Sequence, residues 1–264
     1  MNIGIIGNGI VGGATARAFM EFASVRCYDS DPHRRTHSLE ETCQSEIVFL
    51  CLPTPNLVYQ FDLAALDDVL EKVPSGPLYV IKSTVGLGDT QALAFRYSTL
   101  NIVHSPEFLT QRCALTDAII PARNIVGRTI KDDGEELAEL YRRRFSAPCL
   151  TMKSEESELV KLACNAFFAT KVTFFNMIHQ TAEQRNLSYE TVLRGMLSDG
   201  RIAHSHTSVP GPDGQLGFGG ACLPKDTSSL LGSTRSSPTD PNLLSTVLAC
   251  NRKIREGSLW KRSA

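Results

Sequence analysis

Short apolar runs alternate with amphipathic stretches over the first 150 residues of the chain. The apolar runs predict strands at Asn2–Ile6, Ser24–Tyr28, Glu46–Leu52, Leu78–Lys82, Asn101–His104 and Asn124–Gly127. The stretches between them follow the helical period and predict helices at Val11–Phe22, Asp62–Val73, Thr90–Tyr97 and Gly134–Phe145. Strands and helices that alternate at this spacing predict an α/β fold with a doubly wound parallel sheet.

After about residue 150 the pattern becomes helical. Ser154, followed by acidic residues, predicts a capped helix start, and the apolar period from Leu159 through Thr181 predicts one long helix. Shorter helices are expected at Ser188–Met196, Asp226–Leu231 and Leu243–Arg255, a loop at Asp199–Leu216 and a polar linker at Gly232–Pro241. We therefore predict an α/β domain over residues 1–150 and an all-α domain, built on the long helix, over residues 151–264.

Composition excludes several classes of function. The 264 residues are 42% hydrophobic and 21% charged, with a formal net charge of −1, which argues against broad nucleic-acid binding. No window approaches a membrane-spanning length, and glycines interrupt the first apolar run, so we expect neither a membrane segment nor a signal peptide. The eight cysteines form no C-x-x-C pair, which predicts reduced thiols in a cytoplasmic protein and no metal site.

A glycine fingerprint lies between the first strand and the first helix. Gly7-Asn8-Gly9-Ile10-Val11-Gly12 has the spacing that lets backbone approach a pyrophosphate at a helix N-terminus. Asp29 ends the second strand, where an acidic residue binds the ribose 2′-hydroxyl and disfavours a 2′-phosphate. The motif predicts NAD as the cofactor. A glycine turn beside a capping aspartate is the alternative interpretation.

The stretch Gly217–Asp226 combines three glycines with Cys222, Lys225 and Asp226. Such a loop suits a cysteine nucleophile, because glycines let backbone approach a ligand closely. Free cysteines are also common small core residues, so the segment alone leaves both interpretations open.

Taken together, these motifs make the chain resemble the nucleotide-sugar dehydrogenase family, to which UDP-glucose 6-dehydrogenase and GDP-mannose dehydrogenase belong. Five segments carry the resemblance in the family's order: Leu52–Pro55, Ser83–Val85, Ser105–Leu109, Glu158–Lys171 and Gly219–Asp226.

The resemblance implies a cofactor set and a catalytic set. For NAD it implies the fingerprint glycines with Ile10 and Val11, Asp29, Arg34 near the adenosine ribose, and the turn residues Pro53, Thr54 and Thr84. For catalysis it implies Cys222 as nucleophile, Lys161 and Asn165 as oxyanion donors, Glu107 in thioester hydrolysis, and Thr84 with Asp226 around an ordered water. Phe108, Leu109, Phe218, Gly219 and Lys225, with Glu107, Lys161 and Asn165, are implied substrate residues.

The implied reaction oxidises the C6 alcohol of a nucleotide sugar to a carboxylate, with a homodimer formed through the long helix. Three features depart from the family pattern. Gln111 stands where members often carry a glutamate, a Pro-Gly-Pro-Asp-Gly segment precedes the cysteine loop, and the chain ends where members continue into a nucleotide-binding domain. We therefore expect a chain that lacks this C-terminal UDP-binding domain.

Two other hypotheses remain open. One is the same chemistry on a smaller sugar or a hydroxy acid. The other is a non-catalytic, NAD-binding partner subunit, which the combination of Cys222, Lys161, Asn165 and Asp226 argues against. The 3-hydroxyacid dehydrogenases share the two-domain plan but need no cysteine, so Cys222 discriminates against them.

Overall fold

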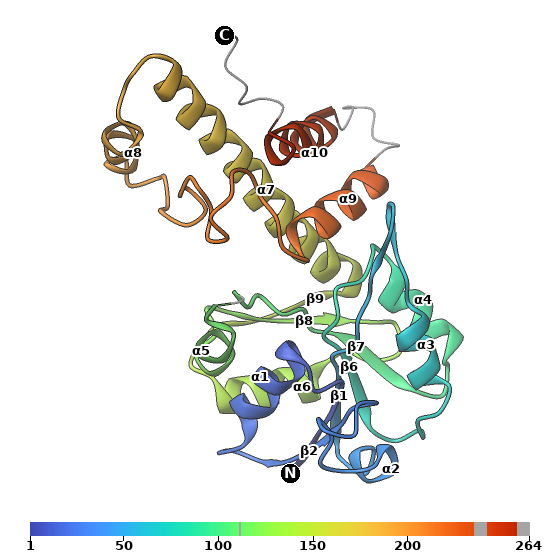
Figure 1. Ribbon diagram of the computed structural model, residues 1–264. Helices are drawn as coiled ribbons and strands as arrows, with labels where there is room; N and C mark the ends of the chain where they lie inside the picture. The colour runs from blue at the N-terminus through green and yellow to red at the C-terminus, as the bar shows by residue number, and fades with distance from the viewer. Residues whose placement is uncertain (111, 235–241, 258–264) are drawn as a thin grey trace. The chain divides into compact units, whose positions relative to one another are not determined.

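A computed structural model describes residues 1–110, 112–234 and 242–257 (Figure 1). The chain divides into two compact units, Met1–Lys161 and Leu162–Ala264, and each is described by itself. A domain boundary at residue 150 would fall inside a strand, β9 (Cys149–Lys153), which the sequence analysis did not predict. The boundary at 150 stays a prediction.

Unit 1 is built on a seven-stranded sheet with the strand order β2-β1-β3-β6-β7-β8-β9. Its other strands are β1 (Asn2–Ile6), β2 (Ser24–Tyr28), β3 (Ile47–Leu50), β6 (Leu78–Ile81), β7 (Asn101–His104) and β8 (Asn124–Arg128). Neighbouring strands pair in parallel from β2 to β7, as predicted. The pair β7–β8 is antiparallel, so β8 and β9 run against the other five strands, which the sequence analysis did not foresee.

Strand residues alternate between two faces of this sheet. Ile3, Ile5 and Phe49 pack in one buried cluster with helices α1 and α6, whereas Ile6, Val48 and Leu50 pack in a second with α3 and α4. Because both faces are covered by helices, the strands are continuously apolar rather than alternating with polar residues.

The predicted helices of unit 1 are all present. They are α1 (Ile10–Phe19), α3 (Ala64–Leu70), α4 (Asp89–Arg96) and α6 (Glu135–Arg144). Four short elements were missed: α2 (Leu39–Thr42), α5 (Ala114–Ile119) and the hairpin of β4 (Asn56–Leu57) with β5 (Gln60–Phe61).

The chain connections place a topological switch point between β1 and β3. The chain moves from β1 to β2 on one side and then returns to β3 on the other side of β1. Ligands of open α/β sheets bind at the carboxyl ends of the strands at this point. The glycine fingerprint follows β1 and the turn Leu52–Pro55 follows β3, so both predicted cofactor segments begin there.

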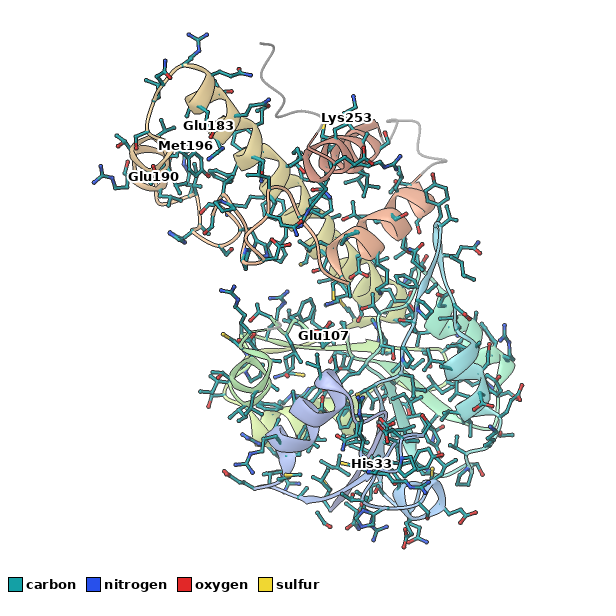
Figure 2. The ribbon with its side chains drawn as sticks, in the orientation of Figure 1. His33, Glu107, Glu183, Glu190, Met196 and Lys253 are labelled. Atoms are coloured by element: carbon teal, nitrogen blue, oxygen red, sulfur yellow. The ribbon has the colours of Figure 1, made fainter. Side chains whose placement is uncertain are left out.

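The helix α7 (Ser154–Gln184) begins in unit 1 and supplies the longest element of unit 2. Helices α8 (Tyr189–Leu197), α9 (Leu223–Thr234) and α10 (Asn242–Arg255) complete unit 2. Phe175 and Ala182 of α7 pack with Tyr189 and Met196 of α8 in one apolar cluster. Figure 2 shows Met196 on α8.

The predicted linker Gly232–Pro241 is corrected at its start, because residues through Thr234 continue α9. The rest of that segment lies outside the described residues. Within the described ranges, no helix combines the length and the apolarity that a membrane span requires.

Candidate active site

The turn after β1 has the close packing that a dinucleotide loop requires. Gly7 has a φ of +90°, and a Cβ there would lie 2.5 Å from the carbonyl oxygen of Cys51. A Cβ at Gly12 would lie 1.9 Å from the carbonyl oxygen of Gly7, so α1 starts directly against the turn. Gly9 precedes α1 with no side-chain cap and with open space around it. The N-terminus of α1 is therefore accessible to an anionic group, as NAD binding requires.

Asp29 lies beside this loop. One carboxylate oxygen accepts a hydrogen bond from the backbone N–H of Asn8 at 2.7 Å, and the other accepts from that of Asp31 at 2.9 Å. Each carboxylate oxygen has more than one lone pair, so both retain capacity for ribose hydroxyls. The Asn8 side chain donates to the carbonyl oxygen of Arg34 at 2.6 Å, whereas the Arg34 guanidinium is exposed near Asp31.

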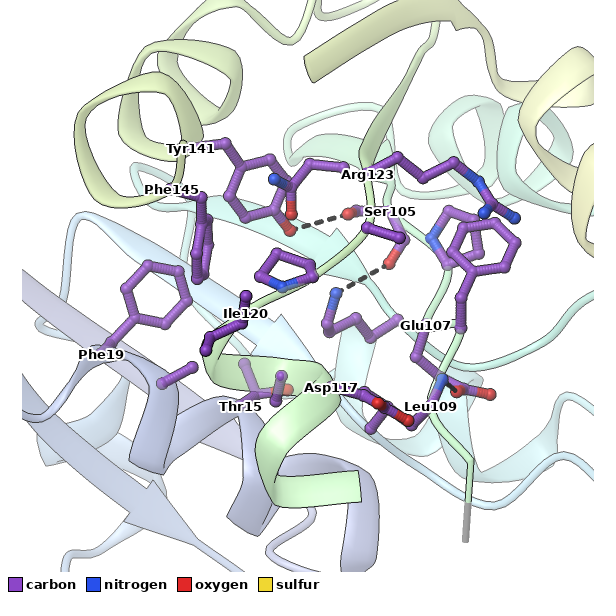
Figure 3. A pocket seen from close by; sticks show the side chains of 18 of the residues that line it. Thr15, Phe19, Ser105, Glu107, Leu109, Asp117, Ile120, Arg123, Tyr141 and Phe145 are labelled. Atoms are coloured by element: carbon purple, nitrogen blue, oxygen red, sulfur yellow. Dashed lines mark hydrogen bonds between the residues drawn. The ribbon is translucent and has the colours of Figure 1, made fainter. Parts of the chain in front are cut away.

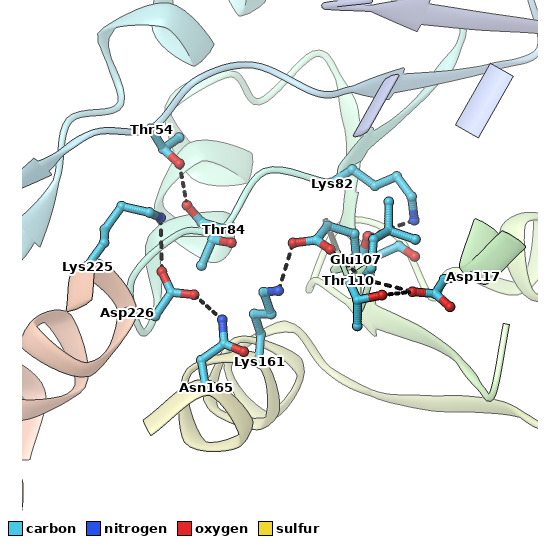
Figure 4. Close-up of polar contacts among 12 residues, drawn as sticks. Thr54, Lys82, Thr84, Glu107, Thr110, Asp117, Lys161, Asn165, Lys225 and Asp226 are labelled. Carbon is cyan, nitrogen blue, oxygen red and sulfur yellow. Dashed lines mark hydrogen bonds and ion pairs between the residues drawn. The ribbon is translucent and has the colours of Figure 1, made fainter. Parts of the chain in front are cut away.

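A second pair of turns is tied together by hydroxyl groups. Thr54 Oγ1 donates to the carbonyl oxygen of Thr84 at 2.7 Å (Figure 4). Ser83 Oγ donates to the carbonyl oxygen of Leu52 and accepts from its N–H. The turn after β3, which includes exposed Pro53, is thus fixed against the turn after β6.

Glu107 and Lys161 form a buried ion pair in unit 1. Lys161 Nζ donates to Glu107 Oε1 at 2.7 Å, and the two side chains are 5% and 11% exposed. The other carboxylate oxygen of Glu107 accepts from the N–H of Leu109 at 2.7 Å. The carboxylate is therefore held by two donors at the end of β7 (Figure 4).

Phe108 lies between two cations. Its ring centroid is 3.9 Å from the Arg123 guanidinium carbon and 5.6 Å from Lys161 Nζ. A cavity of about 240 Å³ adjoins the same loop, with Glu107 and Leu109 at one end and Phe19 and Phe145 at the other (Figure 3).

One turn before Lys161, Glu158 anchors α7 to α4. Its carboxylate accepts from the backbone N–H groups of Gly88 at 2.6 Å and Thr90 at 2.9 Å, at the N-terminus of α4. Glu158 is fully buried, and this burial raises its pKa to about 7 despite the hydrogen bonds that lower it.

The cysteine segment of unit 2 opens a helix. Cys222 is exposed and immediately precedes α9, and its carbonyl oxygen accepts from the N–H of Asp226 at 2.9 Å. All eight cysteines are free thiols, as predicted. Because α9 begins at Leu223, the predicted helix start at Asp226 was late by one turn. The Cys222 thiol lies at the N-terminus of this helix, a position that generally favours a thiolate.

Asp226 is fully buried and has two partners in unit 2 (Figure 4). Asn165 Nδ2 donates to Asp226 Oδ2 at 2.5 Å, and Lys225 Nζ lies 2.9 Å from Asp226 Oδ1. Lys161 and Asn165 are four residues apart on α7, so both side chains leave one face of the helix.

Comparison with known proteins decides the family. A model of the NAD-binding domain of the UDP-glucose/GDP-mannose dehydrogenase family matches residues 33–145, and a model of its central domain matches residues 155–253. The chain belongs to this family. Unit 1 accordingly carries the NAD-binding domain of UDP-glucose/GDP-mannose dehydrogenases.

Individual relatives agree with this assignment. UDP-glucose 6-dehydrogenase of Campylobacter jejuni is 32% identical over 198 residues, an alignment that covers 72% of this chain and 48% of the relative. UDP-glucose 6-dehydrogenase of Pseudomonas aeruginosa is 30% identical over 305 residues, which cover 97% of this chain and 66% of the relative. A UDP-glucose dehydrogenase structure from Pyrobaculum islandicum has a TM-score of 0.83 at 26% identity, covering 95% of this chain and 68% of that one. The chain spans about half the length of the first curated relatives that it matches.

The sequence analysis missed the residues that hold the cysteine loop. Asn251 of α10 accepts from the N–H of Phe218 at 2.7 Å and donates to its carbonyl oxygen at 2.9 Å. Asn176 of α7 accepts from the N–H of Gly217 at 2.9 Å, and Arg255 donates to the Phe218 carbonyl oxygen at 3.2 Å. The available signal was a polar side chain within an apolar helical period, as at Asn176 and Asn251.

Two predicted substrate residues have clear positions in this loop. The Phe218 side chain is 3% exposed and packs with Ala169 and Val247, and both of its backbone groups are bound. Phe218 therefore supports the loop, and we do not include it among the substrate-binding residues that we propose. A Cβ at Gly219 would lie 2.4 Å from the Arg255 guanidinium. The predicted departure at Gln111 lies outside the described residues.

Proposed function

We propose that this chain carries out the NAD-dependent oxidation of the C6 alcohol of a nucleotide sugar, UDP-glucose in the first instance, to a carboxylate. The observation that carries the proposal is the pairing of an exposed Cys222 at a helix N-terminus with a buried Asp226 that binds the amide of Asn165. The named relatives are UDP-glucose 6-dehydrogenases, which supports UDP-glucose as substrate.

NAD, when bound, supplies the hydride acceptor. The residues that we assign to hold it are the Gly7–Gly12 loop with Ile10 and Val11, Asp29, Arg34, Pro53, Thr54 and Thr84. The tight packing at Gly7 and Gly12, the uncapped N-terminus of α1 and the free lone pairs of Asp29 support this assignment. A 2′-phosphate would meet the Asp29 carboxylate, which favours NAD over NADP.

In the first oxidation, the C6 hydroxyl loses a proton and its carbon loses a hydride. We assign the proton to Asp226 through a water that Thr84 helps to hold. Asp226 is buried, accepts a hydrogen bond from Asn165 and forms an ion pair with Lys225, which together keep one orientation of its carboxylate. A fixed group of this kind suits proton transfer.

In the second oxidation, the Cys222 thiolate adds to the aldehyde carbon and forms a carbon–sulfur bond. Lys161 and Asn165 donate to the oxygen that becomes negative, an effect commonly worth about 3–4 kcal/mol per donor. Loss of the second hydride leaves a thioester on Cys222. Glu107 orients the water that hydrolyses it, which releases the carboxylate and returns the thiol.

The Lys161–Glu107 ion pair supports a shared role in this last step. Little solvent reaches the pair, so a change in charge near one side chain changes the electrostatic energy of the other. The Leu109 N–H binds the Glu107 carboxylate, and the Phe108 ring lies 5.6 Å from the Lys161 ammonium, which supports assigning Phe108 and Leu109 to the substrate side. We assign Gly219 and Lys225 to the substrate side as well, from the motif that they match.

We also propose a homodimer formed through α7. Phe167, Phe174 and Met177 are 62%, 43% and 51% exposed, and their spacing places them along one stripe of the helix. Exposed aromatic residues in such a stripe mark protein interfaces. Light scattering should report a dimer, and Phe167→Glu with Phe174→Glu should yield monomer. A monomeric wild type would contradict this part of the proposal.

Trapping the covalent intermediate tests the proposed chemistry. Acid quenching during turnover of UDP-glucose with NAD should leave a sugar-nucleotide adduct on the Cys222 peptide, read by mass spectrometry. The Cys222→Ala variant is the matched control. NAD binding without any adduct or NADH, with UDP-glucose and other nucleotide sugars, would refute the proposal and favour a non-catalytic partner.

A further inference from the structure

The cavity beside loop 105–110 is lined by two donor groups with spare hydrogen-bonding capacity. It occupies about 240 Å³ within unit 1, between α1, α5, α6 and the ends of β6 and β8 (Figure 3). None of the residues assigned to NAD lines it. Its chemistry is therefore not explained by the cofactor.

Lys82 reaches this cavity from the end of β6. Its ammonium donates to the carbonyl oxygen of Ser105 at 3.3 Å and lies 5.7 Å and 5.9 Å from the ring centroids of Phe49 and Tyr141. An ammonium has three N–H donors, and no carboxylate of the described residues forms an ion pair with Lys82. This half-buried charge lacks the counter-ion that such groups usually have.

The carboxylates along the same wall are already engaged. Glu107 is bound by Lys161 and by the N–H of Leu109, and Asp117 Oδ2 accepts from both the N–H and the hydroxyl of Thr110. Asn124 adds a second donor to the lining, because its Nδ2 is buried and has no acceptor in the described part of the chain. Among the described residues the Asn124 amide therefore lacks an acceptor, and the Lys82 ammonium donates to one acceptor with three N–H groups, so both can serve a ligand.

The remaining walls are apolar. Phe19, Phe145 and Ile120 stand at one end, and Tyr141 is oriented by a 2.7 Å hydrogen bond to Ser105 Oγ (Figure 3). The volume is below the range of pockets that hold whole nucleotides or drug-sized ligands, about 300–1,000 Å³. The ligand that fits is small, with a compact apolar body and one anionic end.

We propose that this cavity is a binding site for a small monocarboxylate with an aromatic or branched apolar body. Its carboxylate accepts from Lys82 and Asn124, and its body packs against Phe19 and Phe145. Binding is non-covalent. Loop 105–110 forms one wall, so an occupied cavity stiffens the segment that carries Glu107.

Calorimetric titration with sodium benzoate tests the site, with benzamide as the neutral isostere. We expect one saturable benzoate site that Lys82→Met and the benzamide substitution each weaken about tenfold or more, since each removes a charge-assisted hydrogen bond. Asn124→Asp, which keeps shape but places a negative charge beside the ligand, should abolish binding. Lys131→Met, at an exposed lysine of another loop, should bind as the wild type does.

The position of a bound benzoate in a crystal supplies the decisive readout. It can be measured on the wild type even if Lys82→Met fails to fold. A crystal soaked with 4-bromobenzoate should give an anomalous bromine peak between Phe19 and Phe145, with the carboxylate at Lys82. A peak elsewhere, binding that Lys82→Met leaves unchanged, or no saturable binding up to about 10 mM would overturn the proposal. None of these readouts depends on NADH formation.

Discussion

The side-chain amide of Asn165 donates to the carboxylate of Asp226 at 2.5 Å, and this carboxylate is fully buried. The contact joins the middle of α7 to the first turn of α9, directly after Cys222. The bond holds one orientation of the Asp226 carboxylate, whose other oxygen lies 2.9 Å from Lys225 Nζ. This relationship underlies the first prediction.

Asp226→Asn should abolish most turnover while keeping the fold of unit 2. The variant preserves size but loses the proton acceptor, and general-base contributions are typically about 10²–10⁴-fold in kcat. Steady-state NADH formation measures the loss, with circular dichroism as a check on folding. Asn165→Asp, which places two carboxylates together, should lower thermal stability as well. A kcat within threefold of wild type for Asp226→Asn would refute the role.

Glu107→Gln should separate oxidation from hydrolysis. The amide retains the shape of the side chain but cannot assist a water, so the thioester on Cys222 should accumulate after the oxidation steps. Stopped-flow absorbance should then show a burst of NADH followed by turnover slowed about 100-fold. Equal slowing of the burst and of the steady state would contradict this assignment and indicate a role in the oxidation itself.

Gly217 and Gly214 offer a matched pair for the loop before Cys222. Both have positive φ, +73° and +74°. A Cβ at Gly217 would lie 2.5 Å from Asn251 Oδ1, whereas a Cβ at Gly214 would have no described atom within 4 Å. Alanine at either position costs about 1–2 kcal/mol of backbone strain. Gly217→Ala should cost more and should also change the alkylation rate of Cys222, followed by peptide mass spectrometry. Identical behaviour of the two variants would show that Asn251 does not hold the loop.

The raised pKa of Glu158, about 7 against 4.5, gives a pH-dependent stability. Because the folded state binds this proton more tightly, the contribution of Glu158 to the free energy of unfolding should fall as pH rises from about 4.5 to 7, by up to about 1.4 kcal/mol per pH unit. Glu158→Gln should lack this fall. Buried His104, whose pKa is lowered to about 3 by burial, acts in the opposite sense, but equally in both proteins. Urea titrations at several pH values measure the difference, and parallel curves would contradict the assignment.

Local patterns predicted the sheet and the long helix well, because buried parallel strands appear as continuous apolar runs and an amphipathic helix leaves a strong periodic signal. Strand β9 and the reversal at β8 were missed. Leu150 and Thr151 of β9 are exposed and give little apolar signal, and strand direction is decided by pairing with distant residues. The short α2 and α5 have too few residues to show a period.

The candidate site was predictable where motifs name the residue, as at Cys222, Asp226 and Lys161. The residues that hold the cysteine loop were not predicted. Asn176 and Asn251 bind the backbone of residues 41 and 33 positions away, so a polar residue within an apolar helical period marks them but does not reveal their partners. Phe218, a motif residue four positions before Cys222, packs in an apolar cluster of unit 2, which the motif alone does not reveal.

The yield of NADH per molecule of sugar tests the central claim most directly. Limiting UDP-glucose should be consumed with excess NAD, and NADH and sugar acid should be quantified together. The account predicts two NADH per sugar with no free aldehyde for the wild type, and no more than one for Cys222→Ala. One NADH per sugar in the wild type, or two in Cys222→Ala, would contradict it.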